Sequence, residues 1–207
     1  GDTGNGLMSS LRPEARPASL KPAPDLIDFS FIMEQEGFKQ NIYVPRDEGG
    51  VKALGKSGPT IASGFDLGQR NLADLAGLPP ALISKLEPYL GLKKQAAIDF
   101  VKANALNITE EETAIINSFA KDQETGRLIK LWNKTSKTPW GDLTSEQATV
   151  VASVAFQFGN LSIKAPTFWG HVTKGNWDMA IGELRNFGDK TPSRRNREAD
   201  YLESGTF

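Results

Sequence analysis

Thr60-Ile61-Ala62-Ser63-Gly64-Phe65-Asp66-Leu67-Gly68 is the most informative stretch of this sequence. Thr60 and Ile61 favour a strand, and Gly64 is typical of a turn or bulge. Thr60 and Asp66 lie six residues apart, so a regular strand would carry the hydroxyl and the carboxylate on one face. Such a pair is able to hold and polarise a water molecule. The alternative is a hairpin, in which Thr60 is simply a strand former and Asp66 is a turn or N-cap residue.

A second carboxylate with a distinctive setting precedes this stretch. A helix is predicted from near Asp25 to Gly37, with apolar residues at helical spacing and a glycine suited to a left-handed stop. Glu36 falls beside the apolar stripe at the end of this helix, whereas Glu34 falls well away from it. Desolvation would favour a protonated Glu36 near neutral pH, as a general acid requires. The alternative is that Glu36 caps the helix or pairs with an arginine on the surface.

The remaining pattern predicts an α+β fold that is predominantly helical. Strand formers and glycine turns between residues 40 and 69 indicate a small antiparallel sheet near the N-terminal part. Thr109 and Thr144 each open a capped helix with an acidic first turn. The later segments predicted as helices are 72–78, 80–90, 93–105, 109–125, 127–134, 145–158, 167–175, 177–186 and 191–203.

Glycine and proline punctuate residues 1–24, which we interpret as a tether from an upstream domain, followed by one ordered domain over residues 25–207. The sequence begins without a methionine and has no basic, apolar signal peptide. It also has no apolar run long enough for a membrane-spanning helix.

Composition excludes several kinds of chemistry. The chain has no cysteine and one histidine, His171, so a thiol nucleophile, a Cys-based metal site and a Ser–His–Asp triad are not expected. The acidic groups 110–112 and 122–124 lack the spacing of a calcium loop and are interpreted as solvated helix faces, so no metal or cofactor is expected. With 24 basic and 25 acidic residues, the net charge of −1 argues against a nucleic-acid binder. Catalysis would therefore depend on carboxylates and hydroxyls.

Several segments together resemble the phage-type lysozymes. Glu36-Gly37 followed by the Thr60–Gly68 stretch is similar to their active-site segment, and Asp66-Leu67-Gly68 is closer to the pesticin-like toxin branch. Four downstream segments resemble the family as well: Phe156-Gln157-Phe158-Gly159, Asn176-Trp177-Asp178-Met179-Ala180, Thr191-Pro192-Ser193-Arg194 and the closing stretch 194–202.

The resemblance implies a lysozyme-like fold with a helical C-terminal lobe and a muramidase that cleaves the MurNAc–GlcNAc β-1,4 linkage of peptidoglycan. It makes Glu36 the general acid, Asp66 the carboxylate that activates water, and Thr60 the hydroxyl that positions it. Arg194 matches an arginine that pairs with the catalytic glutamate, and Gln157 matches a residue of the substrate cleft.

This sequence departs from the family pattern in two places. Ala62 stands where the family has its first glycine after Thr-Ile, and the connection between Tyr43 and Thr60 is longer than in phage lysozymes. That connection contains Asp47-Glu48-Gly49, which resembles the Asp-x-Glu-Gly turn of the phage branch. Asp47 is therefore a rival to Asp66 for the water-activating role.

The resemblance also implies a biological setting. We expect a monomeric toxin domain that is made in the cytoplasm and delivered by an upstream domain or secretion machinery to the cell wall of target bacteria. Its expected partners are peptidoglycan strands and an immunity protein that blocks the cleft, without nucleic acid or membrane insertion. The alternative is a non-catalytic module of the same fold that binds peptidoglycan or a partner protein.

Overall fold

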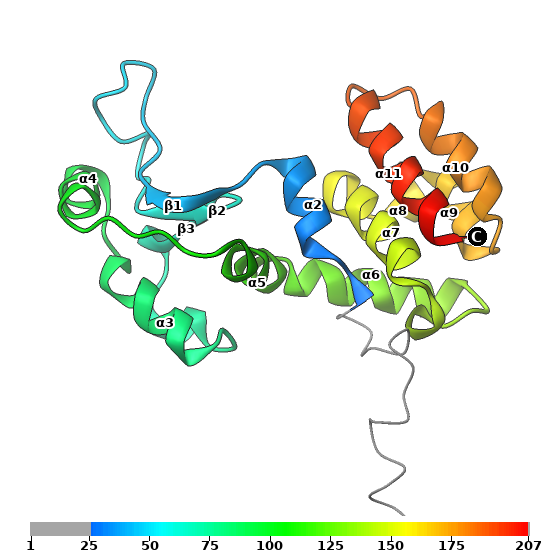
Figure 1. The fold of residues 1–207 in the computed structure, drawn as a ribbon, viewed down its shortest axis with the longest axis horizontal. Coiled ribbons are helices and arrows are strands. Elements are labelled where there is room, and N and C mark those ends of the chain that lie inside the picture. The colour runs from blue at the N-terminus through cyan, green and yellow to red at the C-terminus, as the bar shows by residue number, and fades with distance from the viewer. Residues whose placement is uncertain (1–25, 207) are drawn as a thin grey trace, which may run out of the picture. The chain divides into compact units, whose positions relative to one another are not determined.

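The computed structural model describes residues 26–206, so the predicted tether over residues 1–24 lies outside the described residues. The fold is mostly helical with one small antiparallel sheet, which confirms the predicted α+β class (Figure 1). The described chain forms two compact units, 29–123 and 26–28 together with 124–206. They are called the sheet unit and the helical unit below, and each is described by itself. Whether residues 25–207 act as one catalytic domain stays a prediction.

The sheet unit places three short strands among helices. Strand β1 (Lys39–Tyr43) pairs with β2 (Thr60–Ala62), which pairs with β3 (Phe65–Asp66), all antiparallel. The α-helices of this unit are α2 (Phe29–Glu36), α3 (Pro80–Leu86), α4 (Lys94–Ala103) and α5 (Glu110–Ala120). Short 3₁₀ helices cover Leu67–Gln69, Leu72–Leu75 and Glu87–Tyr89.

Strands β2 and β3 form a hairpin, so Thr60 and Asp66 do not lie on one regular strand and the hairpin alternative is confirmed. Thr60 pairs directly with Asp66, and Ile61 with Phe65. The chain reverses because Ala62 and Gly64 adopt left-handed φ angles of 58° and 84°. Left-handed backbone costs an alanine about 1–2 kcal/mol more than a glycine. This explains why a glycine suits position 62 better than the alanine found there.

A hydrophobic cluster packs against the sheet. Ile61 and Leu67 are fully buried, and Phe65 makes an edge-to-face contact with Phe119 of α5. Other buried members come from the sheet and the helices around it: Ile42, Leu75, Leu78, Leu82, Leu86, Tyr89, Ile108 and Ile116. Ile61, Phe65 and Leu67 therefore pack into one core, which favours the observed register.

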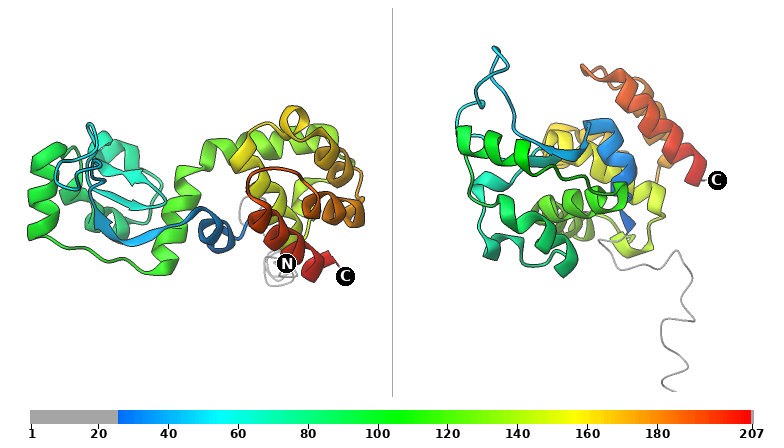
Figure 2. Two further views of the ribbon diagram at one scale, coloured as in Figure 1. Left: turned by 90° about the horizontal axis from the view of Figure 1, so that it is seen from above. Right: turned by 60° about the vertical axis from the view of Figure 1, so that its left-hand side comes forward.

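The helical unit is built from six α-helices: α6 (Asp122–Thr135, of which the first two residues belong to the sheet unit), α7 (Ser145–Phe158), α8 (Leu161–Lys164), α9 (Pro166–Thr173), α10 (Trp177–Arg185) and α11 (Pro192–Thr206). Helices α10 and α11 pack against each other, and α11 also packs against α7 (Figure 2). None of the helices within residues 26–206 combines the length and apolar character that spanning a membrane requires.

Tryptophan side chains form the centre of the helical unit. Trp132 is fully buried, and its ring contacts those of Trp140 and Trp169 edge-to-face. It also stacks on Trp177, with the two ring centroids 6.3 Å apart. Such aromatic pairs add stability beyond the burial of their surface. All four tryptophans of the chain lie in this unit, so their fluorescence reports on it selectively.

The capped helix starts are confirmed, but several helix boundaries differ from the predicted ones. Helix α2 begins at Phe29 and not near Asp25, which lies outside the described residues. Thr109 and Thr144 both form capping boxes, and α7 has the predicted bounds. The break expected at Gly126 lies instead at Lys121, whose ψ of 12° ends α5. Gly126 lies inside α6, with open space around it. The helix tolerates the roughly 1 kcal/mol by which glycine is less favourable than alanine in a helix interior. The segment 72–78 forms only a 3₁₀ helix over Leu72–Leu75, and α8 was not anticipated.

Gly58 and Gly68 lie where separate loops of the sheet unit approach so closely that their backbone atoms are in contact. A Cβ built on Gly58 would lie 2.3 Å from the Leu92 carbonyl oxygen and 2.5 Å from the Gly68 Cα. A Cβ on Gly68 would meet the same carbonyl at 2.4 Å. Because these neighbours are backbone atoms, no rotamer change is able to make room. The glycines at 58 and 68 are therefore required by the close approach.

We predict that Gly58→Ala lowers the free energy of unfolding of the sheet unit by about 1–3 kcal/mol or more, because the backbone must move to accommodate the new methyl group. Far-UV circular dichroism during urea denaturation measures the effect. The control is Gly182→Ala in α10, where a Cβ meets nothing within 4 Å. This change should leave stability unchanged or raise it by up to about 1 kcal/mol. Equal effects of the two substitutions would contradict the interpretation.

Candidate functional site

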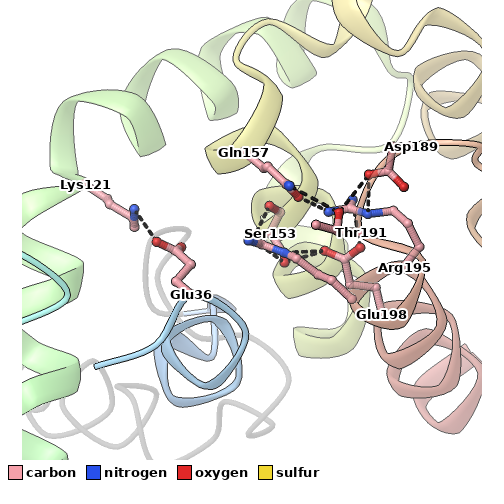
Figure 3. A network of polar contacts seen from close by, with 9 residues as sticks. Glu36, Lys121, Ser153, Gln157, Asp189, Thr191, Arg195 and Glu198 are labelled. Atoms are coloured by element: carbon pink, nitrogen blue, oxygen red, sulfur yellow. Dashed lines mark hydrogen bonds and ion pairs between the residues drawn. The ribbon is translucent and has the colours of Figure 1, made fainter. Parts of the chain in front are cut away.

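Glu36 is the last residue of α2, and its carboxylate forms an ion pair with Lys121, where Oε2 and Nζ are 3.2 Å apart (Figure 3). Only 21% of the Glu36 side chain and 19% of the Lys121 side chain are exposed. Gly37 follows with a φ of 81°, so the predicted left-handed stop is confirmed. Glu36 therefore forms an ion pair, as the alternative interpretation expected, but its partner is a lysine at the end of α5 and not an arginine.

Ser63 connects the end of α2 to the hairpin and to α5. Its hydroxyl donates to the Gly37 carbonyl oxygen at 2.8 Å, and its backbone N–H donates to Asn117 Oδ1 at 3.2 Å. The Lys121 N–H in turn donates to the Asn117 carbonyl oxygen at 3.2 Å. These contacts all lie within the sheet unit, and they hold Glu36, its ion-pair partner and the hairpin turn together.

Asp66 stabilises the loop crossing described above. Its Oδ1 accepts from the Gly68 N–H at 2.8 Å, and both carboxylate oxygens accept from the Gly58 N–H at 3.2 and 3.3 Å. Gln69 adds a longer bond of 3.4 Å. Asp66 is thus the N-cap of the following 3₁₀ helix, as one sequence interpretation proposed. Its part in activating water stays a prediction.

Thr60 lies opposite Asp66 across the hairpin, so the structure brings these two predicted site residues together. The Thr60 hydroxyl donates to the Gly58 carbonyl oxygen at 2.9 Å, and the residue is only 3% exposed. Gly58 is therefore bonded by both residues, through its N–H to Asp66 and through its carbonyl to Thr60. The predicted role of Thr60 in positioning water is not tested by these contacts.

Asp47 differs from Asp66 in how its carboxylate is used. It lies in the long connection between β1 and β2, where its N–H donates to the Lys52 carbonyl and its own carbonyl accepts from Gly50. Within residues 26–206, its buried Oδ1 has no hydrogen-bond partner. The Asp47 carboxylate thus retains an acceptor that the surrounding chain does not satisfy, and it remains a rival to Asp66.

Gln157 and Arg194 lie in the helical unit and have partners there. Arg194 Nη2 donates to the carbonyl and the hydroxyl of Ser153 at 2.9 and 3.1 Å, and its Nε is 3.6 Å from Glu198. Gln157 accepts from Arg195 and donates to Thr191 at 3.2 Å. The predicted substrate-binding roles of Gln157 and Arg194 stay predictions.

Sequence reasoning did not identify the buried charge network around Arg195 and Glu198 (Figure 3). These side chains are 1% and 0% exposed, and Arg195 Nη1 lies 2.8 Å from Glu198 Oε1. The Ser153 hydroxyl donates to Glu198 at 2.5 Å, and Asp189 lies 3.4 Å from Arg195 Nε. Burial raises the pKa of Glu198 and lowers the pKa of Arg195, while the opposite charge of each partner counteracts the shift. The spacing of three residues on one helix was a signal that could have indicated the pair.

No group of three or more His, Cys, Asp or Glu side chains within residues 26–206 is arranged to hold an ion.

We predict that Glu198→Ala destabilises the helical unit by about 3–5 kcal/mol, because it leaves a buried arginine without its closest anion. Tryptophan fluorescence during urea denaturation reports on this unit. The control is Glu203→Ala on the same helix, which breaks an exposed ion pair with Arg185 and should leave the transition unchanged. A small effect of Glu198→Ala would show that the network does not stabilise the fold.

Comparison with known proteins identifies the family. No protein with a curated description matches the chain. A family model described as a bacterial toxin homologue of phage lysozyme, C-terminal part, matches residues 26–178. The match includes Glu36, Thr60, Asp66 and Gln157 and ends before Arg194. Since the match covers more than half of the sequence and the fold is the α+β arrangement expected, the chain belongs to the Pesticin family of toxin domains homologous to phage lysozyme.

Proposed function

We propose that this chain is a muramidase that hydrolyses the MurNAc–GlcNAc β-1,4 linkage of peptidoglycan. The supporting observation is that Glu36 and the Thr60–Asp66 pair are held in one compact unit by Ser63, within the part of the chain that matches the toxin and phage lysozyme family. A carboxylic acid and a second carboxylate are the two groups that glycoside hydrolysis requires.

Glu36 is the general acid of the proposed reaction. It transfers its proton to the glycosidic oxygen while the bond between that oxygen and the anomeric carbon breaks. The leaving sugar keeps that oxygen as a hydroxyl and departs as a neutral alcohol, which removes the cost of expelling an alkoxide. Lys121 orients the carboxylate by its ion pair, because an ammonium within 3.2 Å restricts the rotamers of Glu36.

Asp66 is the proposed base for the attacking water. It accepts a proton from the water as the oxygen bonds to the anomeric carbon, and Thr60 helps to position that water. Asp47 is the alternative base, because its Oδ1 lacks a partner among the described residues. Gln157 and Arg194 are proposed to contact the glycan.

The proposed setting follows from the toxin family. We propose that the domain is made in the cytoplasm and delivered, through an upstream domain or secretion machinery, to the cell wall of target bacteria. An immunity protein that blocks the cleft is the expected protective partner. None of these proposals enters the chemistry above, so each is testable separately.

We predict that Glu36→Gln lowers the rate of peptidoglycan cleavage by about 10²–10⁴-fold, because an amide is unable to supply the proton. The turbidity of purified sacculi and mass spectrometry of the released muropeptides measure the loss. Glu34→Gln, an exposed position on the same helix, should keep full activity. If wild type and Glu36→Gln act equally, or neither acts between about pH 4 and 8, the enzyme proposal fails. The non-catalytic binding module then becomes the better explanation.

We predict that Asp66→Ala abolishes cleavage while Asp47→Ala retains it. Azide is a nucleophile that needs no deprotonation, so it should restore bond cleavage to Asp66→Ala with a glycosyl azide as product. This rescue separates a lost base from a damaged loop, since Asp66 also bonds the Gly58 and Gly68 amides. The reverse pattern, with Asp47→Ala inactive and rescued by azide, would assign the base to Asp47.

A further inference from the structure

The helical unit contains a pocket that includes none of the predicted catalytic or substrate-binding residues. Its volume is about 460 Å³, and its walls come from α6, the end of α7 and the start of α8. This volume lies within the range of roughly 300–1,000 Å³ found for ligand pockets. We call it the α6–α8 pocket.

Part of the lining of the α6–α8 pocket is apolar, and we call this part its floor. Leu128 and Leu131 contribute from α6, Phe156 from α7 and Leu161 from α8. Leu128 and Leu161 are buried, whereas Leu131 and Phe156 are only partly buried and so offer apolar surface to a ligand. Removing this surface from water would favour binding by about 25 cal/mol per Å².

One wall of the pocket carries three cations. Arg127, Lys130 and Lys134 line it from α6, and all three are exposed. Their spacing of three and four residues puts them on one helix face, over about 10 Å of the helix axis. Within residues 26–206 none of them forms an ion pair. Glu124 is the acidic residue of the lining, so the rim is positive on balance.

The cations of the α6–α8 pocket differ in their pairing from the arginines near the C-terminal end of the same unit. Arg185, Arg194 and Arg195 are each matched by carboxylates of the helical unit. The three cations of the pocket are not matched in this way. Their charge is therefore available to an outside partner.

We infer that the α6–α8 pocket binds an acidic amphipathic helix of a partner protein. Carboxylates one turn apart on such a helix would match the helical spacing of the three cations, and leucine-type side chains between them would enter the apolar floor. A ligand with a single carboxylate would leave two of the cations unpaired. A flat anionic membrane would reach the exposed cations but not the buried Leu128 and Leu161.

The test uses a fluorescein-labelled synthetic peptide of about 20 residues, long enough to be partly helical, with glutamates at successive turns and leucines beside them. Fluorescence anisotropy with the intact chain should show saturable binding that weakens as salt is raised. A peptide of the same composition in scrambled order should bind at least about tenfold more weakly, because it lacks an acidic face and an apolar face.

Variants locate the binding on the protein. The first triple variant replaces the pocket cations, and it should weaken peptide binding at least about tenfold: Arg127→Gln/Lys130→Gln/Lys134→Gln. The control variant removes the same charge at exposed positions elsewhere in the unit: Lys137→Gln/Lys174→Gln/Lys190→Gln. The control should change the affinity for the peptide less than about twofold. Leu131→Gln should also weaken binding, which purely electrostatic attraction would not explain. Circular dichroism verifies that each variant is folded.

Five results would overturn the inference. The first four are absence of saturable binding, equal binding of the scrambled peptide, equal losses in the two triple variants, and binding of phosphatidylglycerol vesicles in place of the peptide through the same three cations. Displacement of the peptide by soluble muropeptides would also overturn it, because the pocket would then belong to the glycan site. The inference does not depend on the proposed muramidase activity, since the Glu36→Gln variant should bind the peptide as the wild type does.

Discussion

Backbone pairing among three short antiparallel strands is the constraint on which the candidate site depends. Strand β1 begins three residues after Glu36, its partner β2 carries Thr60, and β3 carries Asp66. Such short strands are too small to be stable by themselves, so the ladder relies on the buried cluster around Ile61 and on the bonds that Ser63 makes. The ladder and the Ser63 bonds together hold the end of α2 and the hairpin in one unit.

Charge is used differently in the two units. In the sheet unit, Glu36 is paired with Lys121 and Asp66 is bonded to backbone amides, so both carboxylates are oriented by neighbours. In the helical unit, burial of Arg195 and Glu198 ties α11 to Ser153 of α7, whereas the cations along α6 have no anionic partners within the described residues. A net charge of −1 for the whole chain conceals this contrast. Local charge, and not the total, distinguishes a structural network from a surface suited to binding.

Much of the fold could be predicted because its signals are local. Thr109 and Thr144 cap their helices through side chains that reach only three residues along the chain, and Gly37 takes the left-handed conformation that glycine favours. The boundary between α5 and α6 was predicted wrongly at Gly126, because exposure and helical packing made a glycine tolerable there. Likewise, an even spacing did not distinguish one strand from a hairpin, since Thr60 and Asp66 share a face in both.

The sequence by itself narrowed the class of chemistry and predicted the α+β pattern and the family; the fold and the match over residues 26–178 confirm the last two. The sequence does so because composition excludes thiol and histidine mechanisms and because helix caps and turns depend on neighbouring residues. Tertiary structure alone decided which groups meet: Lys121 with Glu36, Gly58 with Asp66, and Arg195 with Glu198. It also created the α6–α8 pocket. The partner of a charge depends on which elements pack together, and only folding brings residues as far apart as 36 and 121 within bonding distance.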